Sequence, residues 1–270
     1  MFAFRSRGVL QSRLGSVTLQ SSSACRLPIH ASRSASTAAD EAAPQPSIWP
    51  RRKKTIFALF AVVGIALTSS IDDMVAPPLL PGTPEDKARV HGLHALYEIA
   101  LPIVKKLRED PDYIEADVYG NYSEDEKLQR LSSGPLRGSR GLGLQKIFYN
   151  DKEKKAVNVA FLGNGLEGWP TIVHGGVLAT VVDEHLARLA IRHFPERTGV
   201  TANLELKYRA PVRSNKFYSF HATLDQERST ERKAWVNGEV RDYNGKLCVE
   251  ATGLFVVPKT YKLQKVGERY

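Results

Sequence analysis

A histidine, two glycines and one aspartate within ten residues are the groups of this chain best suited to chemistry. His174-Gly175-Gly176 begins an apolar run that places Asp183 nine residues after the histidine. A helix that begins at Gly175 leaves backbone N–H groups without intrahelical partners at its positive end, where they can bind a developing oxyanion. A carboxylate in an apolar helix is costly unless it is paired or does chemistry. Together these features predict acyl chemistry.

The spacing of Gly175 and Asp183 has a consequence for assembly. At a rise of about 1.5 Å per residue, they lie roughly 12 Å apart along one helix, too far to act on one substrate. Two antiparallel copies of the helix, side by side, would bring each Asp183 to the other copy's Gly175. If the two groups work together, the spacing therefore predicts a homodimer with composite sites.

The elements that must position these groups follow from the apolar pattern. A helix over Gly175–His193 carries an apolar stripe at helical spacing. Strand patterns lie on both sides of it, and the hairpin turns Asn150-Asp151 and Asn244-Gly245 join neighbouring strands. We expect an α+β fold in which an antiparallel sheet wraps around one long central helix. The expected strands cover 142–150, 155–162, 200–208, 217–227, 232–242 and 247–257.

The chain before this domain reads as a Pro-rich linker and a helical segment. Thr83-Pro84 is a helix start, and apolar residues continue at helical spacing to about residue 108, with a kink expected at Pro102. Residues 109–135 are polar and lack periodicity, so we expect mostly loop with a short helix. The predicted organisation is a linker with helical segment over 74–135 and a domain over 136–260.

The positive charge of the chain lies at its N-terminus. The formal net charge is +9, but nine of the 38 basic and two of the 29 acidic residues precede Thr55, which leaves 29 against 27. A nearly neutral body makes nucleic acid an unsuitable partner. Residues 1–39 are rich in Arg and Ser and contain no acid, which predicts a mitochondrial transit peptide.

A membrane anchor is expected over residues 51–73. The 17 uncharged residues of 55–71 are preceded by four consecutive bases and followed by Asp72-Asp73. The run is short for a spanning helix, but flanking Lys and Arg side chains can extend its effective length. The positive-inside rule would place the bases in the matrix. We therefore expect a single-pass protein of the mitochondrial inner membrane whose domain faces the intermembrane space.

From His174 to Val212 the chain resembles a known family. His174-Gly175-Gly176 with Asp183, followed by the strand Thr201–Val212, is similar to the hotdog-fold acyl-CoA thioesterases of the phenylacetate-degradation and thioesterase-superfamily-member type. The membrane-anchored N-terminus is like that of mitochondrial forms in fungi. The resemblance covers roughly residues 140–257. It implies a hotdog fold, an acyl-CoA substrate, a dimer that can pair further into a dimer of dimers, and no cofactor or metal.

The resemblance also implies roles for individual residues. Asp183 would be the nucleophile or general base, and the Gly175 N–H would polarise the thioester carbonyl. Thr201, 18 residues after the aspartate, would orient water. His174 would mainly shape the turn. The remaining candidates are substrate-binding residues: Gly176, Asn164 in place of an asparagine that some members carry where this chain has Gly168, and Lys207 and Arg209 for the phosphates of coenzyme A.

The same residues are compatible with two other classes of protein. A lipase-like serine esterase would need a G-x-S-x-G elbow, and no downstream serine has the flanking glycines. A non-catalytic hotdog module that binds acyl-CoA or a protein partner at a membrane remains the alternative. The combination of Asp183 with Thr201 favours an enzyme over that alternative.

Overall fold

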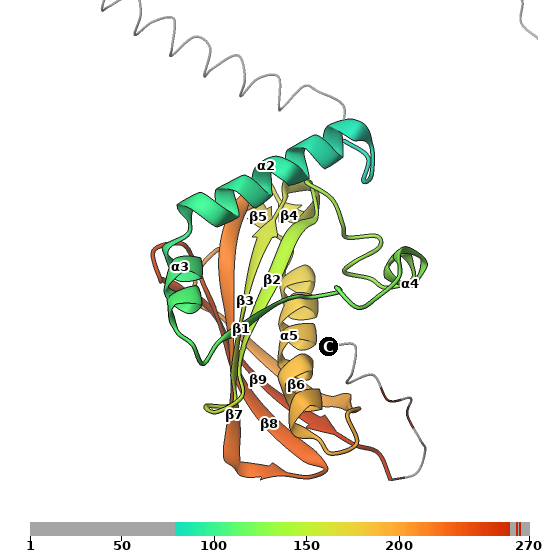
Figure 1. Ribbon diagram of the computed structural model, residues 1–270, viewed down its shortest axis with the longest axis vertical. Coiled ribbons are helices and arrows are strands. Elements are labelled where there is room, and N and C mark those ends of the chain that lie inside the picture. Colours follow the sequence, from blue (N-terminus) through green and yellow to red (C-terminus); the bar gives the residue numbers. More distant parts are fainter. Residues whose placement is uncertain (1–78, 260–262, 264, 266–270) are drawn as a thin grey trace, which may run out of the picture. The chain divides into compact units, whose positions relative to one another are not determined.

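A seven-stranded antiparallel sheet organises the structure, with strand order β1-β2-β3-β7-β8-β9-β6 (Figure 1). The computed structural model describes residues 79–259, 263 and 265. The predicted transit peptide and membrane anchor lie outside these residues. Within the described ranges, no helix combines the length and apolar character needed to cross a membrane. The strands are β1 (Ile114–Asp117), β2 (Leu142–Asn150), β3 (Lys155–Leu162), β6 (Val200–Tyr208), β7 (Lys216–Thr230), β8 (Lys233–Arg241) and β9 (Leu247–Val256).

One face of the sheet packs on the long helix α5 (Gly175–His193), as predicted. The expected stripe of Leu178, Val182, Leu186 and Leu189 is buried, each at most 3% exposed. Glycines on the sheet allow this close approach. A Cβ atom at Gly238 of β8 would lie only 2.8 Å from a Leu186 methyl carbon. The predicted hotdog arrangement, an antiparallel sheet around one helix, is confirmed.

Two helices that precede the sheet in sequence pack on the β2–β3 part of its other face (Figure 1). Pro102 ends the first helix, so that α2 (Pro84–Ala100) and α3 (Pro102–Glu109) are separate helices rather than one kinked helix. Two hydrophobic cores result, one between the sheet and α5 and one between the sheet and the helices α2 and α3. The side chains of β3 alternate between them: Ala156 and Ala160 belong to the core at α5, and Val157, Val159 and Phe161 belong to the other core. The structure thus has three layers: α5, the sheet, and the pair α2 and α3. The predicted boundary between the helical segment and the domain, at residue 136, therefore runs between segments that pack against each other.

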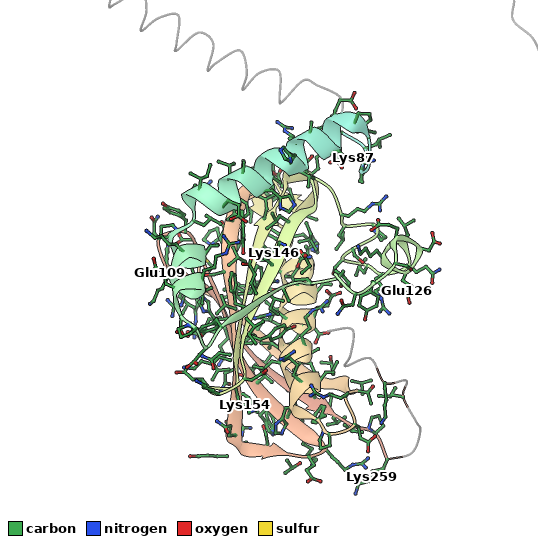
Figure 2. All side chains as sticks on the ribbon, in the orientation of Figure 1. Lys87, Glu109, Glu126, Lys146, Lys154 and Lys259 are labelled. Carbon is green, nitrogen blue, oxygen red and sulfur yellow. The ribbon has the colours of Figure 1, made fainter. Side chains whose placement is uncertain are left out.

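The stretch 109–135 is more ordered than its composition indicates. It contributes β1, which pairs with β2, and the short helix α4 (Glu124–Leu128), which begins with a capping box at Ser123 and Glu126. Lys146 of β2 forms an ion pair with Asp117 of β1 at 2.6 Å. Figure 2 labels Lys146 on the sheet and Glu126 on α4. This segment is ordered because β1 pairs with β2 of the sheet, a contact that the local sequence pattern does not predict.

The N-terminal end of α2 is fastened to the domain by a buried carboxylate. Asp86 is 3% exposed and accepts hydrogen bonds from the backbone N–H of Gly82 and from the N–H and hydroxyl of Ser139. Burial acts to raise the pKa of Asp86, but these hydrogen bonds hold it below its usual range. The carboxylate therefore ties α2 to the loop before β2.

Candidate active site

Asp183 of α5 and Thr201 of the edge strand β6 are in contact. The Thr201 hydroxyl donates a hydrogen bond of 2.9 Å to Asp183 Oδ1. Asp183 is half-buried, and burial is the main reason why its pKa is raised; the nearby Glu184 charge also raises it, whereas the hydrogen bond from Thr201 lowers it. A carboxylate with a raised pKa is a stronger base, and a hydroxyl fixes its orientation. The predicted Asp183–Thr201 pair is therefore in contact within one protomer.

A β-bulge places Thr201 on the face of β6 that looks at α5. Leu204 and Leu206 are partly buried against the core around α5, so simple alternation would assign Ala202 to this face and Thr201 to the other. The register against β9 shifts between Thr201 and Asn203, and Thr201 lies opposite Phe255, a residue of the same core. The extra residue re-aims the threonine toward Asp183.

The start of α5 is built as a donor site. His174 is the N-cap, and its Nδ1 accepts the Gly176 N–H at 3.0 Å, so the histidine shapes the turn as expected. Nothing in the described part of the chain accepts the Gly175 N–H, which leaves it available to a ligand. A Cβ at Gly168 would approach His174 to 2.7 Å. The turn therefore has no room at 168 for the asparagine that some members carry.

Tyr208 is a residue of the site that the sequence interpretation missed. It lies at the end of β6 and donates a 2.7 Å hydrogen bond from its hydroxyl to the Gly175 carbonyl. It is 54% exposed despite its size. Its even spacing from Leu204 and Leu206 is a signal that it faces α5, but nothing local reveals the contact with the helix start.

Both halves of the candidate site therefore lie along β6. Thr201 with Asp183 marks one end of the strand, and Tyr208 with Gly175 marks the other. Gly175 and Asp183 stay eight residues apart on a continuous helix, so one protomer does not bring them together. Strand β6 is an edge strand with β9 as its only neighbour among the described residues.

Asp183 also lines a cavity of about 270 Å³ between α5 and the segment that carries α4. Beside it, Glu184 accepts hydrogen bonds from Tyr119 at 2.7 Å and from the buried Ser132 at 2.8 Å. Arg188, buried on the same helix, stacks its guanidinium over the Tyr119 ring at 4.8 Å. Residues 119–132 thus close one side of the aspartate's surroundings, a role that the sequence interpretation left open.

The remaining predicted substrate-binding residues lie apart from Asp183. The Asn164 side chain accepts a 3.3 Å hydrogen bond from Arg140 in a separate pocket. Lys207 and Arg209 are exposed and paired, to Glu205 at 3.4 Å and to Glu250 at 2.7 Å. Ion pairs occupy both cations, which weakens the expectation that they contact phosphates. Within the residues described, no group of His, Cys, Asp and Glu has the geometry of a metal site.

Two residues that could be mistaken for catalytic groups are structural. His185 of α5 is 2% exposed, and burial lowers its pKa to about 3, so it is neutral. Cys248 is 2% exposed, and burial raises the pKa of its thiol. Neither is a nucleophile or a base in this environment.

Comparison with known proteins identifies the family. The thioesterase superfamily matches residues 171–249. An uncharacterized protein of Schizosaccharomyces pombe is 31% identical over 171 residues, which are 62% of this chain and 94% of that protein. The uncharacterized mitochondrial membrane protein FMP10 of Saccharomyces cerevisiae is 32% identical over 160 residues, 57% of this chain and 62% of FMP10. Acyl-coenzyme A thioesterase THEM4 of Mus musculus is 30% identical over 141 residues, 52% of this chain and 59% of THEM4.

Among solved structures, a hypothetical thioesterase of Streptococcus pneumoniae with coenzyme A is 16% identical, with a TM-score of 0.35 over 39% of this chain and 80% of that one. The matched segments span less than two thirds of FMP10 and of THEM4. The chain belongs to the thioesterase superfamily. The resemblance predicted from His174, Gly175 and Asp183 is confirmed.

Proposed function

We propose that this protein hydrolyses acyl-CoA thioesters to a free acid and coenzyme A. The observation that carries the proposal is a half-buried Asp183 with a raised pKa, hydrogen-bonded to Thr201, on the same helix whose first N–H is unoccupied. A module that only binds acyl-CoA has no need of a carboxylate kept partly desolvated beside a hydroxyl. The activity named for THEM4 supports the same conclusion for a relative.

The chemistry assigns each group one task. Asp183 removes a proton from a water molecule held by Thr201, and the water oxygen attacks the thioester carbon. The carbonyl electron pair moves onto oxygen, and the Gly175 N–H stabilises the oxyanion, an effect of about 3 kcal/mol per donor in known cases. The oxyanion collapses, the carbon–sulfur bond breaks, and the thiolate of coenzyme A takes the proton. Direct attack by Asp183, followed by hydrolysis of the anhydride, uses the same groups.

The proposed active unit is a homodimer formed through β6. A free edge strand presents unpaired N–H and C=O groups to a second copy. If two β6 strands pair antiparallel about a two-fold axis near Leu204 and Glu205, Thr201 of one copy lies across from Tyr208 of the other. Because Thr201 holds Asp183 and Tyr208 holds Gly175, this pairing completes both sites at once.

The proposed location is the mitochondrial inner membrane, with the domain facing the intermembrane space. Two observations support a mitochondrial membrane location: the acid-free, Arg-rich residues 1–39 followed by the apolar run 55–71, and the similarity to the mitochondrial membrane protein FMP10. The proposed orientation rests on the four bases at 51–54 and the positive-inside rule. Protease treatment of mitoplasts tests the orientation, because a domain in the matrix would survive it.

Hydrolysis of an acyl-CoA panel by the full chain tests the proposed function. We expect Asp183→Asn and Asp183→Ala to lower kcat by about 10²- to 10⁴-fold, because the base is lost. Thr201→Ser should retain most turnover, whereas Thr201→Val should lose it. Circular dichroism and sedimentation of each variant control for folding and assembly.

Undiminished turnover in both Asp183 variants would overturn the role of the aspartate. If the wild type binds acyl-CoA but hydrolyses no chain length, the non-catalytic hotdog module is the better description.

A further inference from the structure

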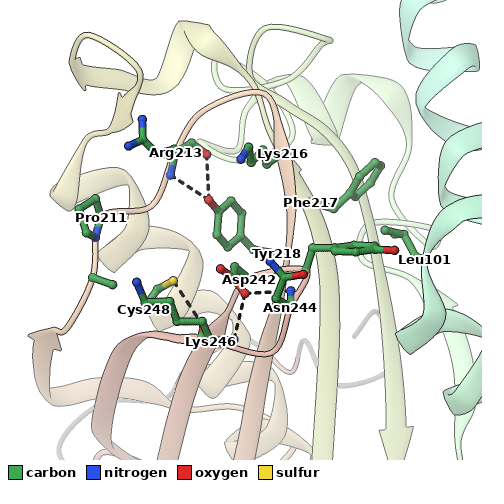
Figure 3. Close-up of a pocket in the computed structure, with 12 residues that line it drawn as sticks. Leu101, Pro211, Arg213, Lys216, Phe217, Tyr218, Asp242, Asn244, Lys246 and Cys248 are labelled. Carbon is green, nitrogen blue, oxygen red and sulfur yellow. Dashed lines mark hydrogen bonds between the residues drawn. The ribbon is translucent and has the colours of Figure 1, made fainter.

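A second cavity lies beside the loop that follows β6, and Asp183 is not among the residues that line it. It has a volume of about 490 Å³ and is lined by the β6–β7 loop, the start of β7, the turn between β8 and β9, and Leu101 at the α2–α3 junction. Figure 3 shows Arg213 and Lys216 above the Tyr218 ring and Lys246 below it in that view. None of the groups proposed for the chemical step lines this cavity.

Three cations line this cavity. Arg213 and Lys216 come from the β6–β7 loop and the first residue of β7, and Lys246 comes from the β8–β9 turn. Within the described residues none of the three forms an ion pair with a carboxylate. Lys207 near the end of β6 and Arg209 just after that strand are both paired with carboxylates. Three like charges converge at a cost unless an anion joins them. Three cations and one acid, Asp242, give the lining a net charge of +2, which favours an anion.

The cavity wall is held in place by hydrogen bonds. The Tyr218 hydroxyl, 3% exposed as a residue, accepts the Arg213 N–H at 2.8 Å and donates to the Arg213 carbonyl at 3.1 Å. The single acid of the lining, Asp242, accepts the N–H groups of Asn244 and Lys246 at 2.9 Å each with one oxygen. It thereby shapes the turn that presents Lys246. These bonds fix the backbone that carries two of the three cations.

The same loop connects the cavity to the start of α5. The Val212 carbonyl accepts the Val173 N–H at 2.9 Å, and the Thr171 carbonyl accepts the Ser214 N–H at 3.0 Å. Val173 is two residues before Gly175, the proposed oxyanion donor. An anion bound by Arg213 is therefore separated from the proposed reaction centre by little more than the width of one loop.

Aromatic surface accompanies the charge. Tyr243 at the cavity is 62% exposed, and Phe217 lines the same wall. An exposed ring beside cations is the combination that binds a base and its phosphates, because the base stacks on the ring and the phosphates pair with Lys and Arg. A carboxylate or inorganic phosphate would use the cations and leave the ring unused.

We infer that this cavity binds the phosphorylated nucleotide end of the CoA thioester, with Arg213, Lys216 and Lys246 as its phosphate-binding residues. The inference rests on the proposed function and deepens it. It moves the phosphate contacts from Lys207 and Arg209 to a preformed cavity. The cations act on substrate affinity and have no part in the chemical step.

A comparison of two substrates with the same acyl group tests this inference in the full chain. One is the acyl-CoA, and the other is the acyl-N-acetylcysteamine thioester, which lacks the nucleotide. Alanine substitution of Arg213, Lys216 or Lys246 should each raise KM for acyl-CoA by about 3- to 10-fold, with kcat retained, because each removes one exposed charge contact. Hydrolysis of the short thioester should not change. The wild-type KM for acyl-CoA should rise with salt, and that rise should be smaller in the triple variant.

Lys233→Ala is the matched control, since it removes an exposed lysine at the opposite end of β8. Lys207→Ala and Arg209→Ala test the rival phosphate contacts. If these two raise KM and the cavity variants do not, the inference is overturned. Equal effects of the cavity variants on both thioesters would also overturn it, because the nucleotide would then be irrelevant.

Calorimetry with desulfo-CoA and ADP keeps this test independent of turnover. We expect desulfo-CoA to bind the wild type and to lose affinity in the triple variant. Tighter binding of ADP than of desulfo-CoA would point to a free nucleotide and overturn the assignment. If no thioester is hydrolysed but desulfo-CoA binding still depends on the three cations, the proposed function fails and the cavity assignment stands.

Discussion

Asp183 carries its charge where the surrounding protein opposes it. Burial and the neighbouring Glu184 raise its pKa, and the single compensating contact in the described structure is the hydrogen bond from Thr201. Holding a carboxylate in this way lowers stability, which is the expected cost if Asp183 is the proposed base. The sequence indicated the aspartate, because a carboxylate in an apolar helix is conspicuous. It did not indicate Tyr208, whose bond to Gly175 depends on how β6 crosses α5.

The cost of Asp183 predicts a stabilising substitution. Because its pKa in the folded state exceeds its ordinary value of 3.8, ionisation favours the unfolded chain, and the cost grows as pH rises through the folded-state pKa. Asp183→Asn should therefore raise the melting temperature at pH 7 by about 1–3 °C while activity is lost. The gain should shrink as pH falls toward 3.8. Thermal unfolding between pH 4 and pH 7 is the measurement.

Asp125→Asn changes an exposed carboxylate of α4 and serves as the control, with little expected change over the same range. A melting temperature for Asp183→Asn below that of the wild type at pH 7 would show that the charge is compensated by contacts other than Thr201.

At the scale of elements, β6 and its bulge decide the geometry of the site. Patterns that depend on neighbours in sequence were predicted well: the stripe of α5, the hairpin at Asn150-Asp151 and the strand limits of β2, β3 and β6. Features that depend on distant pairing were not. The order of β1 comes from β2, and the bulge between Thr201 and Asn203 comes from the register against β9. Alternation alone would have turned Thr201 away from Asp183.

Replacing a glycine by alanine should change stability differently at the contact of α5 with the sheet and on an exposed helix. Gly238→Ala places a Cβ 2.8 Å from a methyl carbon of the fully buried Leu186, so the free energy of unfolding should fall by about 1–3 kcal/mol. Gly92→Ala is the matched change in α2, where a Cβ would meet nothing within 4 Å. It should raise stability by about 0.5–1 kcal/mol, because alanine favours helix. Urea unfolding measures both, and equal effects would mean that α5 can move away from β8.

At the scale of the whole molecule, the proposed composite site can be tested by mixing two inactive variants. Gly175→Pro removes the oxyanion N–H at a helix position that accepts proline, and His174 already has the extended backbone (φ −60°, ψ 130°) that a following proline requires. Asp183→Asn removes the base. In random mixed dimers of the two, we expect about a quarter of wild-type activity, because half the dimers are mixed and each has one intact site.

Gly175→Ala is the control for this experiment. It keeps the N–H and adds a Cβ 3.3 Å from the Tyr208 hydroxyl, so it should retain turnover that Gly175→Pro loses. If co-expressed Gly175→Pro and Asp183→Asn chains restore no activity while forming mixed dimers, the site lies within one protomer and the proposed pairing through β6 is wrong.

The cover of α2 and α3 over the sheet determines where this protein can be shortened. A chain trimmed to begin at residue 136, the predicted start of the hotdog domain, would lose both helices and β1. Water would then reach the apolar side chains of β2 and β3 that these helices bury, namely Leu144, Phe148, Val157, Val159 and Phe161. A contiguous apolar surface of this kind promotes aggregation. A fragment that stays soluble therefore has to begin before Gly82, so that Asp86 keeps its hydrogen bonds from both Gly82 and Ser139.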